Sequence, residues 1–282
     1  MPHFIERDSV RIHYLRHDGP AAPLVLLHGL TANAHYFDGL VQAGLTETHG
    51  ALVMDLRGRG LSDKPPTGYS MAEHAADVIA LLDHHGIERA AICGHSYGGL
   101  LAIYLASEYP DRIARAVIID IAGPSIRNPK VLELLKPSLD RLGKVFPSMD
   151  EFLAARTQQA HLDVPWDDAI ERFFRADVEP LPDGTVRVRI PPEVIAQVIG
   201  EGQKVDWQER LRRVGQQALL LNATGPYGPP GTPPLVLEEQ AREAVSLMPH
   251  CRYQWVPGNH MTMLFGANAH TILAHIRAFL AE

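Results

Sequence analysis

The chain has 282 residues, of which 46% are hydrophobic and 21% are charged, a composition typical of a folded globular protein. A formal charge of −7 and the absence of a basic cluster argue against nucleic acid or an anionic membrane as the main partner. No run of about 18 apolar residues occurs and the charged N-terminus lacks an apolar core segment, so neither a transmembrane helix nor a signal peptide is expected.

Two cysteines occur, Cys93 and Cys251, and each lies in an apolar strand-like run. We interpret both as buried free thiols, which fits a reducing compartment. A cytoplasmic protein is therefore predicted.

Short apolar runs in the first half of the chain predict the strands of one sheet. Val10–His17 alternates apolar and polar residues, as a half-exposed strand does. The later runs are continuously apolar, which is typical of strands buried on both faces. They are Pro23–Gly29, Gly50–Asp55, Ala90–Ser96 and Ala114–Asp120.

Helical stretches separate these strands. One is capped by Ser70, with Glu73 three residues later, and stops at Gly86. A second follows Ser96 and ends before Pro110. Because strands and helices alternate, we expect an α/β fold with a mostly parallel, doubly wound sheet.

The alternation stops near Pro124, and residues 124–213 are helix-like, richer in charge and interrupted by proline. The core pattern then returns with a strand at "QALLLNA", a helix near Leu235–Met248, the strand "CRYQWVPG" and a helix near Ala267–Ala281. We therefore predict a core domain formed by residues 1–123 and 214–282. Residues 124–213 form the inserted helical cap, or lid, domain.

The segment Gly94-His95-Ser96-Tyr97-Gly98 lies between an apolar strand and an apolar helix. This is the context of a G-x-S-x-G nucleophile elbow, in which small residues on both sides allow a very tight turn. The turn lifts the serine hydroxyl above the sheet at the N-terminus of the next helix, where developing negative charge is favoured. Ser96 is therefore the predicted nucleophile.

Four segments together resemble the α/β-hydrolase superfamily, and the resemblance covers most of the chain outside residues 124–213. Besides the elbow, they are "LLHGLTANAHYFDGL", "DLRGRGLSDKP" and "VPGNHMTML". The resemblance implies an α/β-hydrolase fold, a loop that binds an oxyanion after the third strand, and a catalytic histidine in the last segment. That histidine is His260, the base that a serine nucleophile requires.

The position of the acid is unusual. In many relatives the carboxylate lies just past the strand formed here by "ALLLNA", but Leu219–Val236 contains no charged side chain. Some members of the superfamily carry the acid at the end of the preceding strand, where this chain has Asp120. An ionised carboxylate at the end of an apolar strand is costly unless it is paired, and His260 would pair with it. Hydrogen bonding to backbone groups alone is the alternative.

The resemblance also implies an oxyanion hole made by the backbone N–H groups of Leu30 and Tyr97. We expect His28 to shape the turn of this loop, and His95 to point away from Ser96 and serve packing. The aromatic residues of the insertion either line an apolar acyl pocket or form the insertion's own core. They are Phe152, Trp166, Phe173 and Phe174.

The sequence thus predicts a serine hydrolase acting on a small-molecule acyl substrate through Ser96, His260 and Asp120. A carboxylic ester is the default substrate, while lactone, amide or carbon–carbon bond hydrolysis would use the same residues. Serine at position 96 argues against an epoxide hydrolase or dehalogenase, which would need aspartate. No metal-binding or nucleotide-binding motif occurs, so no cofactor is expected. A ligand-binding protein on a hydrolase scaffold and a cofactor-free haloperoxidase are the rivals. The acyl group and the oligomeric state are left open.

Overall fold

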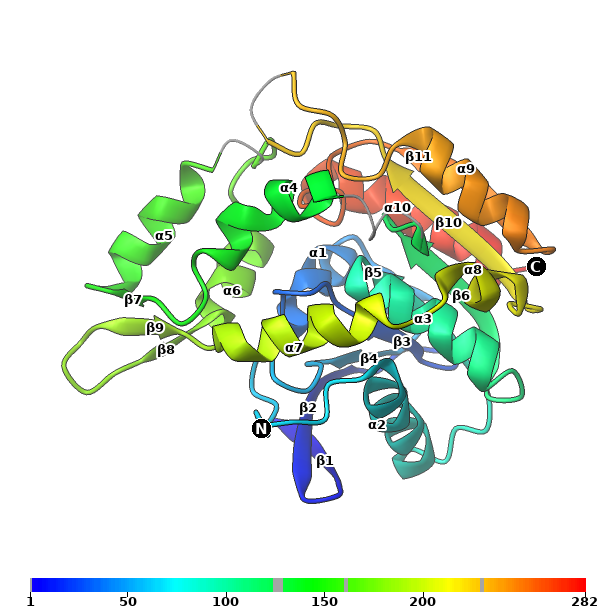
Figure 1. Cartoon of the computed structure of the whole chain (residues 1–282), viewed down its shortest axis with the longest axis horizontal. Helices are drawn as coiled ribbons and strands as arrows, with labels where there is room; N and C mark the ends of the chain where they lie inside the picture. Colours follow the sequence, from blue (N-terminus) through cyan, green and yellow to red (C-terminus); the bar gives the residue numbers. More distant parts are fainter. Residues whose placement is uncertain (1, 124–128, 160–161, 229–230) are drawn as a thin grey trace.

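The computed structural model describes residues 2–123, 129–159, 162–228 and 231–282. Eight strands form the main sheet in the order β1-β2-β4-β3-β5-β6-β10-β11 (Figure 1). The first two pairings, β1 with β2 and β2 with β4, are antiparallel, and all the others are parallel. The strands are β1 (His3–Arg7), β2 (Val10–His17), β3 (Leu24–Leu27), β4 (Ala51–Met54), β5 (Ala90–His95), β6 (Ile113–Ile119), β10 (Gln217–Ala223) and β11 (Cys251–Val256).

These strands confirm the expected mostly parallel α/β sheet. Alternate residues of a strand point to opposite faces, so Val25 and Leu27 join one core cluster while Leu24 and Leu26 join the other. The strand β1 was not predicted as a separate element. It adds an edge strand through a two-residue turn at Asp8 and Ser9, both of which have positive φ.

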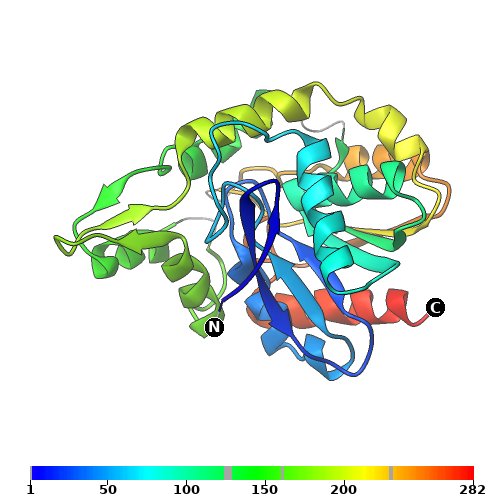
Figure 2. The same ribbon diagram turned by 90° about the horizontal axis from the view of Figure 1, so that it is seen from below.

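Helices cover both faces of the sheet. The helices α1 (Asp38–Gln42) and α10 (Gly266–Leu280) pack on one face. Figure 2 shows α10 on the side of the sheet opposite to α2 and α3. The second face is covered by α2 (Met71–His84), α3 (Tyr97–Glu108), α8 (Trp207–Arg212) and α9 (Glu238–Leu247).

The predicted start of α2 is confirmed at the atomic level. The Oγ of Ser70 accepts a hydrogen bond from the backbone N–H of Glu73 at 3.2 Å, which satisfies one unpaired donor of the first turn. The helix ends just before Gly86, whose φ of 64° is readily adopted by glycine. Local sequence therefore determines both ends of this helix.

Between β6 and β10 the chain leaves the sheet and forms a group of elements at one end of the molecule (Figure 1). A three-stranded antiparallel sheet accompanies the expected helices, in the order β7-β9-β8. Its strands β8 and β9 form a hairpin with Gly184 in the turn (φ 86°). This hairpin differs from the all-helical cap expected from the sequence, although a Pro-Asp-Gly turn between short β-branched runs is a hairpin signal. The elements are α4 (Pro129–Leu139), β7 (Val145–Phe146), α5 (Met149–Thr157), α6 (Asp168–Ala176), β8 (Val178–Pro180), β9 (Val186–Val188) and α7 (Pro192–Gln203).

The division of the chain at residues 124 and 213 stays a prediction. Pro124, the first residue of the expected cap, lies outside the described residues. Near the other boundary, Trp207 and Leu211 of α8 pack with the helices on the core sheet. By its contacts α8 therefore belongs with α3 and α9.

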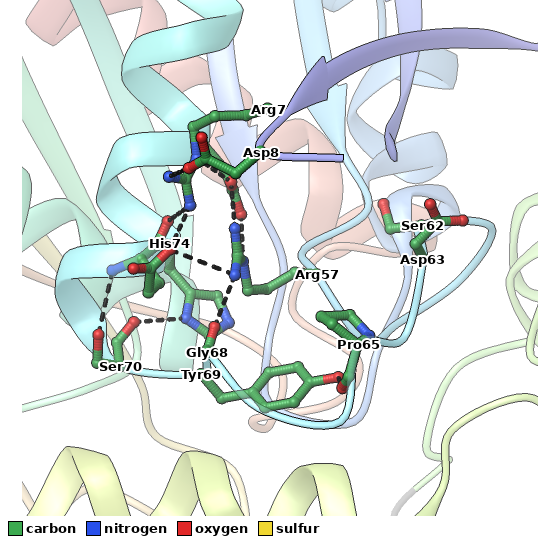
Figure 3. A network of polar contacts seen from close by, with 12 residues as sticks. Arg7, Asp8, Arg57, Ser62, Asp63, Pro65, Gly68, Tyr69, Ser70 and His74 are labelled. Carbon is green, nitrogen blue, oxygen red and sulfur yellow. Dashed lines mark hydrogen bonds and ion pairs between the residues drawn. The ribbon is translucent and has the colours of Figure 1, made fainter. Parts of the chain in front are cut away.

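The loop that follows β4 is held by buried ion pairs. The guanidinium of Arg57 donates two hydrogen bonds of 2.6 Å to the carboxylate of Asp77 on α2 and one of 2.7 Å to the carbonyl of Gly68. Arg7 of β1 reaches the same carboxylate at 2.8 Å, and the hydroxyl of Tyr69 donates to the carbonyl of Pro65 (Figure 3). The bidentate pair of Arg57 with Asp77, together with the contact from Arg7, fixes the loop against β1 and α2.

Both cysteines are free thiols, as expected. Cys93 is buried in β5, whereas Cys251, at the start of β11, is only partly buried because it lies in the edge strand. Among the helices of the described ranges, none is long and apolar enough to cross a lipid bilayer.

Candidate active site

Ser96 lies in the turn between β5 and α3, with φ 54° and ψ −118°. The turn is too tight for side chains at its flanks. A Cβ atom at Gly94 would lie 1.9 Å from the carbonyl oxygen of Gly98, and one at Gly98 would lie 2.0 Å from that of Leu27. These clearances explain in physical terms why glycine occurs two positions before and after the serine.

The sheet register brings three chain positions together. His95 pairs with Ile119 of β6, and Ile119 pairs with Leu221 of β10. The next residues, Ser96, Asp120 and Asn222, therefore emerge side by side at the carboxyl ends of three neighbouring parallel strands. In open α/β sheets this edge is where ligands bind.

His260 connects Ser96 to Asp120. The hydroxyl of Ser96 lies 3.0 Å from Nε2 of His260, and Nδ1 of His260 lies 2.6 Å from Oδ2 of Asp120. An ionised carboxylate can only accept, so Nδ1–H donates to Asp120 and Nε2 is left to accept from the serine hydroxyl. The structure thus brings together the three residues predicted as nucleophile, base and acid.

The carboxylate of Asp120 is almost completely buried (1% exposed). Its Oδ1 accepts hydrogen bonds from the backbone N–H of Ala223 at 2.8 Å and from the side-chain amide of Asn222 at 2.9 Å. Both donors belong to the end of β10, within the uncharged stretch Leu219–Val236. Together with His260 they offset the cost of burying an ionised group.

The loop that carries His260 is held by two neighbours. The hydroxyl of Tyr36 and Nε2–H of His95 both donate to the backbone carbonyl of His260, each at 2.9 Å. The rings of His95 and His260 are 4.5 Å apart. Burial, followed by the nearby His260, lowers the pKa of His95 well below its usual value, so it is neutral here. His95, expected to serve packing, therefore also contacts the predicted base directly.

The loop after β3 places Leu30 beside the elbow. Within the described ranges no hydrogen-bond acceptor contacts the backbone N–H of Leu30 or that of Tyr97, the first residue of α3. The guanidinium of Arg59 donates to the carbonyl of Leu30 at 3.1 Å and lies 5.1 Å from the centre of the Tyr97 ring. Arg59 therefore ties together the two residues predicted to form the oxyanion hole.

His28 shapes the start of this loop, as expected. Its ring is fully buried, Nδ1–H donates to the carbonyl of Gly29 at 2.8 Å, and Nε2 accepts from the backbone N–H of Leu56 at 3.0 Å. Burial lowers the pKa of His28 to about 4, so the imidazole is neutral and uses both nitrogens. The same turn is held by Asp55, which accepts from the N–H of Ala34 at 2.7 Å.

Ser96 opens into a cavity of about 70 Å³ between α4, α6 and the loop that follows β3. Phe173 and Phe174, two of the four predicted pocket aromatics, line it. The other two form the insertion's own core, the alternative that the sequence left open. Phe152 is fully buried against Phe146 (ring centres 5.1 Å apart), and Trp166 stacks on Phe174 at 5.4 Å.

Among the polar residues at the site that were not singled out from the sequence are Tyr36, Arg59, Arg141 and Asn222. Tyr36 and Arg59 lie in the two loop segments that carry the family resemblance, so their place in those segments was an available signal. Arg141 lies in the insertion, and its position beside the cavity depends on tertiary packing alone. In the described part of the chain, no three histidine, cysteine or acidic side chains gather as a metal site would require.

Comparison with known proteins identifies the family. The model of the alpha/beta hydrolase fold matches residues 22–223. A 2-(acetamidomethylene)succinate hydrolase of Mesorhizobium japonicum is 30% identical over 225 residues, which make up 78% of this chain and 77% of the relative. A cis-3-alkyl-4-alkyloxetan-2-one decarboxylase of Shewanella oneidensis is 35% identical over 136 residues, 47% of this chain and less than half (42%) of the relative's length.

Solved structures agree over the whole chain. The crystal structure of E-2-(acetamidomethylene)succinate hydrolase superposes with a TM-score of 0.82 at 24% identity, covering 99% of this chain and 100% of that one. The enol-lactonase from Burkholderia xenovorans LB400 superposes with a TM-score of 0.71 at 22% identity and the same coverage. At these identities the likeness concerns the fold. The sheet order, the serine turn after β5 and the match over residues 22–223 together show that the chain belongs to the α/β-hydrolase fold family and is an enzyme of this class.

Proposed function

We propose that the protein hydrolyses a carboxylic ester of a small molecule, with Ser96 as nucleophile, His260 as general base and acid, and Asp120 as the group that orients the imidazole. The observation that carries the proposal is the continuous pair of hydrogen bonds from Ser96 Oγ to His260 Nε2 (3.0 Å) and from His260 Nδ1 to Asp120 Oδ2 (2.6 Å). A serine becomes a useful nucleophile when a base is within this reach.

In the first step Ser96 Oγ attacks the carbonyl carbon while its proton passes to Nε2 of His260. The negative charge on the carbonyl oxygen is stabilised by the backbone N–H groups of Leu30 and Tyr97, aided by the N-terminus of α3. The bond to the leaving alcohol then breaks, and His260 returns the proton to the departing oxygen.

In the second step water attacks the acyl group on Ser96, again with His260 as base. The acid leaves and the serine hydroxyl is restored, so one ester and one water give one acid and one alcohol. Asp120 keeps Nδ1–H of His260 engaged throughout, which leaves Nε2 able to accept a proton.

Amide hydrolysis is the second candidate. The relative from Mesorhizobium japonicum, aligned over 78% of this chain, is named for a substrate that contains an acetamido group. The same three residues serve an amide if His260 protonates the departing nitrogen. Esters and amides with the same acyl group, compared at equal concentration, separate the two activities.

The first test is the intact mass of the protein after exposure to a fluorophosphonate. We expect one covalent adduct on the wild type and none on Ser96→Ala. The matched control is Ser246→Ala, in which an exposed serine of α9 is replaced and labelling should persist. Labelling of Ser96→Ala, or no labelling of the wild type, would contradict the proposal; the second result favours a ligand-binding scaffold. Peroxide-dependent halogenation without ester hydrolysis would instead indicate a haloperoxidase.

A further inference from the structure

Ser96 lies at the junction of two neighbouring compartments of different chemistry. One is the cavity of about 70 Å³ already described, here called the polar compartment. The other, of about 80 Å³, is here called the apolar compartment. Leu30, Ser96 and Leu135 line both. The apolar compartment is completed mainly by hydrocarbon side chains, among them Leu100, Ile121, Val198 and Leu235.

A guanidinium group forms part of the wall of the polar compartment. Arg141 follows α4 and is 8% exposed. It pairs with the carboxylate of Asp177 and donates to the carbonyl of Thr31, in the loop that follows β3, at 2.7 Å. These contacts use two of the five N–H donors of an arginine. Of the described residues that line this compartment, none is acidic.

The charges around Arg141 do not balance. Arg156 does not line the compartment, but it interacts electrostatically with both Arg141 and Asp177. Arg141, Arg156 and Asp177 are all at least nine-tenths buried, which gives two cations to one carboxylate. The guanidinium of Arg156 lies over the ring of Phe152 at 5.3 Å, and its buried Nε meets no hydrogen-bond partner in the described part of the chain. An excess buried cation costs free energy unless an anion offsets it. A bound anion in the polar compartment would do so.

The position of His260 decides which end of the substrate carries that anion. His260 lines the polar compartment and is not among the described residues that line the apolar one. Its Nε2 must protonate the leaving atom, so the leaving group has to lie on the polar side. The acyl group then extends from Ser96 into the apolar compartment.

We propose that the substrate has a short apolar acyl group and a leaving group that bears a carboxylate, which Arg141 binds. This inference rests on the proposed function and deepens it. Hydrolysis of such a compound releases two products. The acyl group leaves the apolar compartment as a carboxylic acid with a hydrocarbon chain. The leaving group leaves the polar compartment as a hydroxy acid, or as an amino acid if the bond is an amide. Arginine suits the role because its planar fork can bind a carboxylate through two parallel hydrogen bonds.

The test compares two esters of the same size, acetoxyacetate and acetoxyacetamide, which differ in a carboxylate or a neutral amide on the leaving group. We expect kcat/KM of the wild type to favour acetoxyacetate by about tenfold or more. Arg141→Gln should reduce this preference at least about tenfold. The control Arg175→Gln removes a half-exposed cation of α6 that pairs with Glu171, and should leave the preference unchanged.

A second pair of esters tests whether the carboxylate is recognised on the leaving group or on the acyl group. Monomethyl succinate and methyl succinamate carry the carboxylate or the amide on the acyl group, and we expect no preference for the charged member. A preference for monomethyl succinate, or a preference for acetoxyacetate that survives Arg141→Gln, would overturn the inference. If Arg141 had only a structural role, Arg141→Gln would lower kcat/KM equally for acetoxyacetate and acetoxyacetamide. That result would also contradict the inference.

If Arg141→Gln does not fold, the wild type still decides the question. Glycolate should inhibit acetoxyacetamide hydrolysis competitively at a concentration at least about tenfold lower than glycolamide does; equal inhibition would overturn the inference. Absence of both turnover and fluorophosphonate labelling would contradict the proposed function instead. In that case calorimetric titration of the wild type with glycolate and glycolamide tests the carboxylate site by itself, and equal or no binding of the two overturns it.

Discussion

Two residues of the candidate site are held in a backbone conformation that side chains rarely adopt. Among described non-glycine residues, positive φ is found at Asp8 and Ser9 in a hairpin turn, at Ser96 (φ 54°) and at Asp120 (φ 50°). Each of the last two donates its N–H to a neighbouring strand, Ser96 to Ile119 at 2.8 Å and Asp120 to the β10 backbone at 2.7 Å. The sheet ladder thus continues one residue beyond each strand and stabilises the strained turn.

At this scale we predict that Asp120→Asn lowers kcat by about 10⁴-fold while the fold is retained, as in serine-protease triads, because an amide no longer fixes the productive tautomer of His260. Steady-state ester hydrolysis measures the loss. Asp163→Asn is the control, since this exposed carboxylate contacts Thr262 in the same loop but not the imidazole. Activity within about tenfold of the wild type in Asp120→Asn would place the acid elsewhere.

At the scale of elements, the packing of α3 against β3 and β5 depends on missing side chains. The carbonyl of Leu27 occupies the space where Gly98 would carry a Cβ, and the carbonyl of Gly98 occupies that space at Gly94. Both obstacles are backbone atoms of buried elements, which cannot move aside as a flexible side chain can. The glycines of this turn are therefore required for folding, whatever chemistry Ser96 carries out.

We predict that Gly94→Ala lowers the free energy of unfolding by more than about 3 kcal/mol or prevents folding, because its Cβ would overlap the Gly98 carbonyl. Gly200→Ala is the matched substitution within α7, where nothing lies within 4 Å of the added atom. It should raise the free energy of unfolding by about 0.5–1 kcal/mol, the usual cost of glycine inside a helix. Urea unfolding of both variants measures the difference; a stable Gly94→Ala would contradict the account.

At the scale of the whole molecule, several buried histidines must stay neutral. Burial lowers the pKa of His28 from 6.5 to about 4, and it lowers the pKa values of His74 and His95 well below 6.5. For His74 the nearby Arg59 adds to this effect, with its Nη1 2.8 Å from Nε2 of the ring. The unfolded chain protonates all three near pH 6.5, whereas the folded protein resists.

Folding stability is therefore predicted to be highest above pH 6.5 and to fall as the pH drops from 6.5 toward 4, because the unfolded state takes up more protons than the folded one. Each such histidine contributes up to about 1.4 kcal/mol per pH unit within this window. Urea unfolding at a series of pH values measures the slope. The control His270→Asn, at an exposed position, should show the same slope as the wild type. A free energy of unfolding that stays constant or rises as the pH is lowered from 6.5 to 5 would contradict the prediction.

Much of the core was predictable because its signals are local. Continuous apolar runs correctly indicated β3 to β6, and Ser70 and Gly86 correctly marked the ends of α2. The hairpin around Gly184 was missed because its strands are only three residues long and lie within charged, proline-rich sequence. Residues 124–213 were harder to interpret because short elements in an insertion depend on contacts from outside.

The sequence by itself determined the fold class, because each strand and helix has a local pattern and these elements alternate along the chain. It also predicted the serine turn and the candidate histidine, since each motif consists of residues within a few positions of one another. It also excluded an acid in the loop after β10, since that loop has no charge. The pairing of Asp120 with His260 was expected from the family resemblance, but only the tertiary structure brought Asn222 to the same carboxylate and placed Arg141 in the cavity that Ser96 lines. These neighbours are distant in the chain and meet through sheet register and the packing of the insertion, which no local pattern encodes.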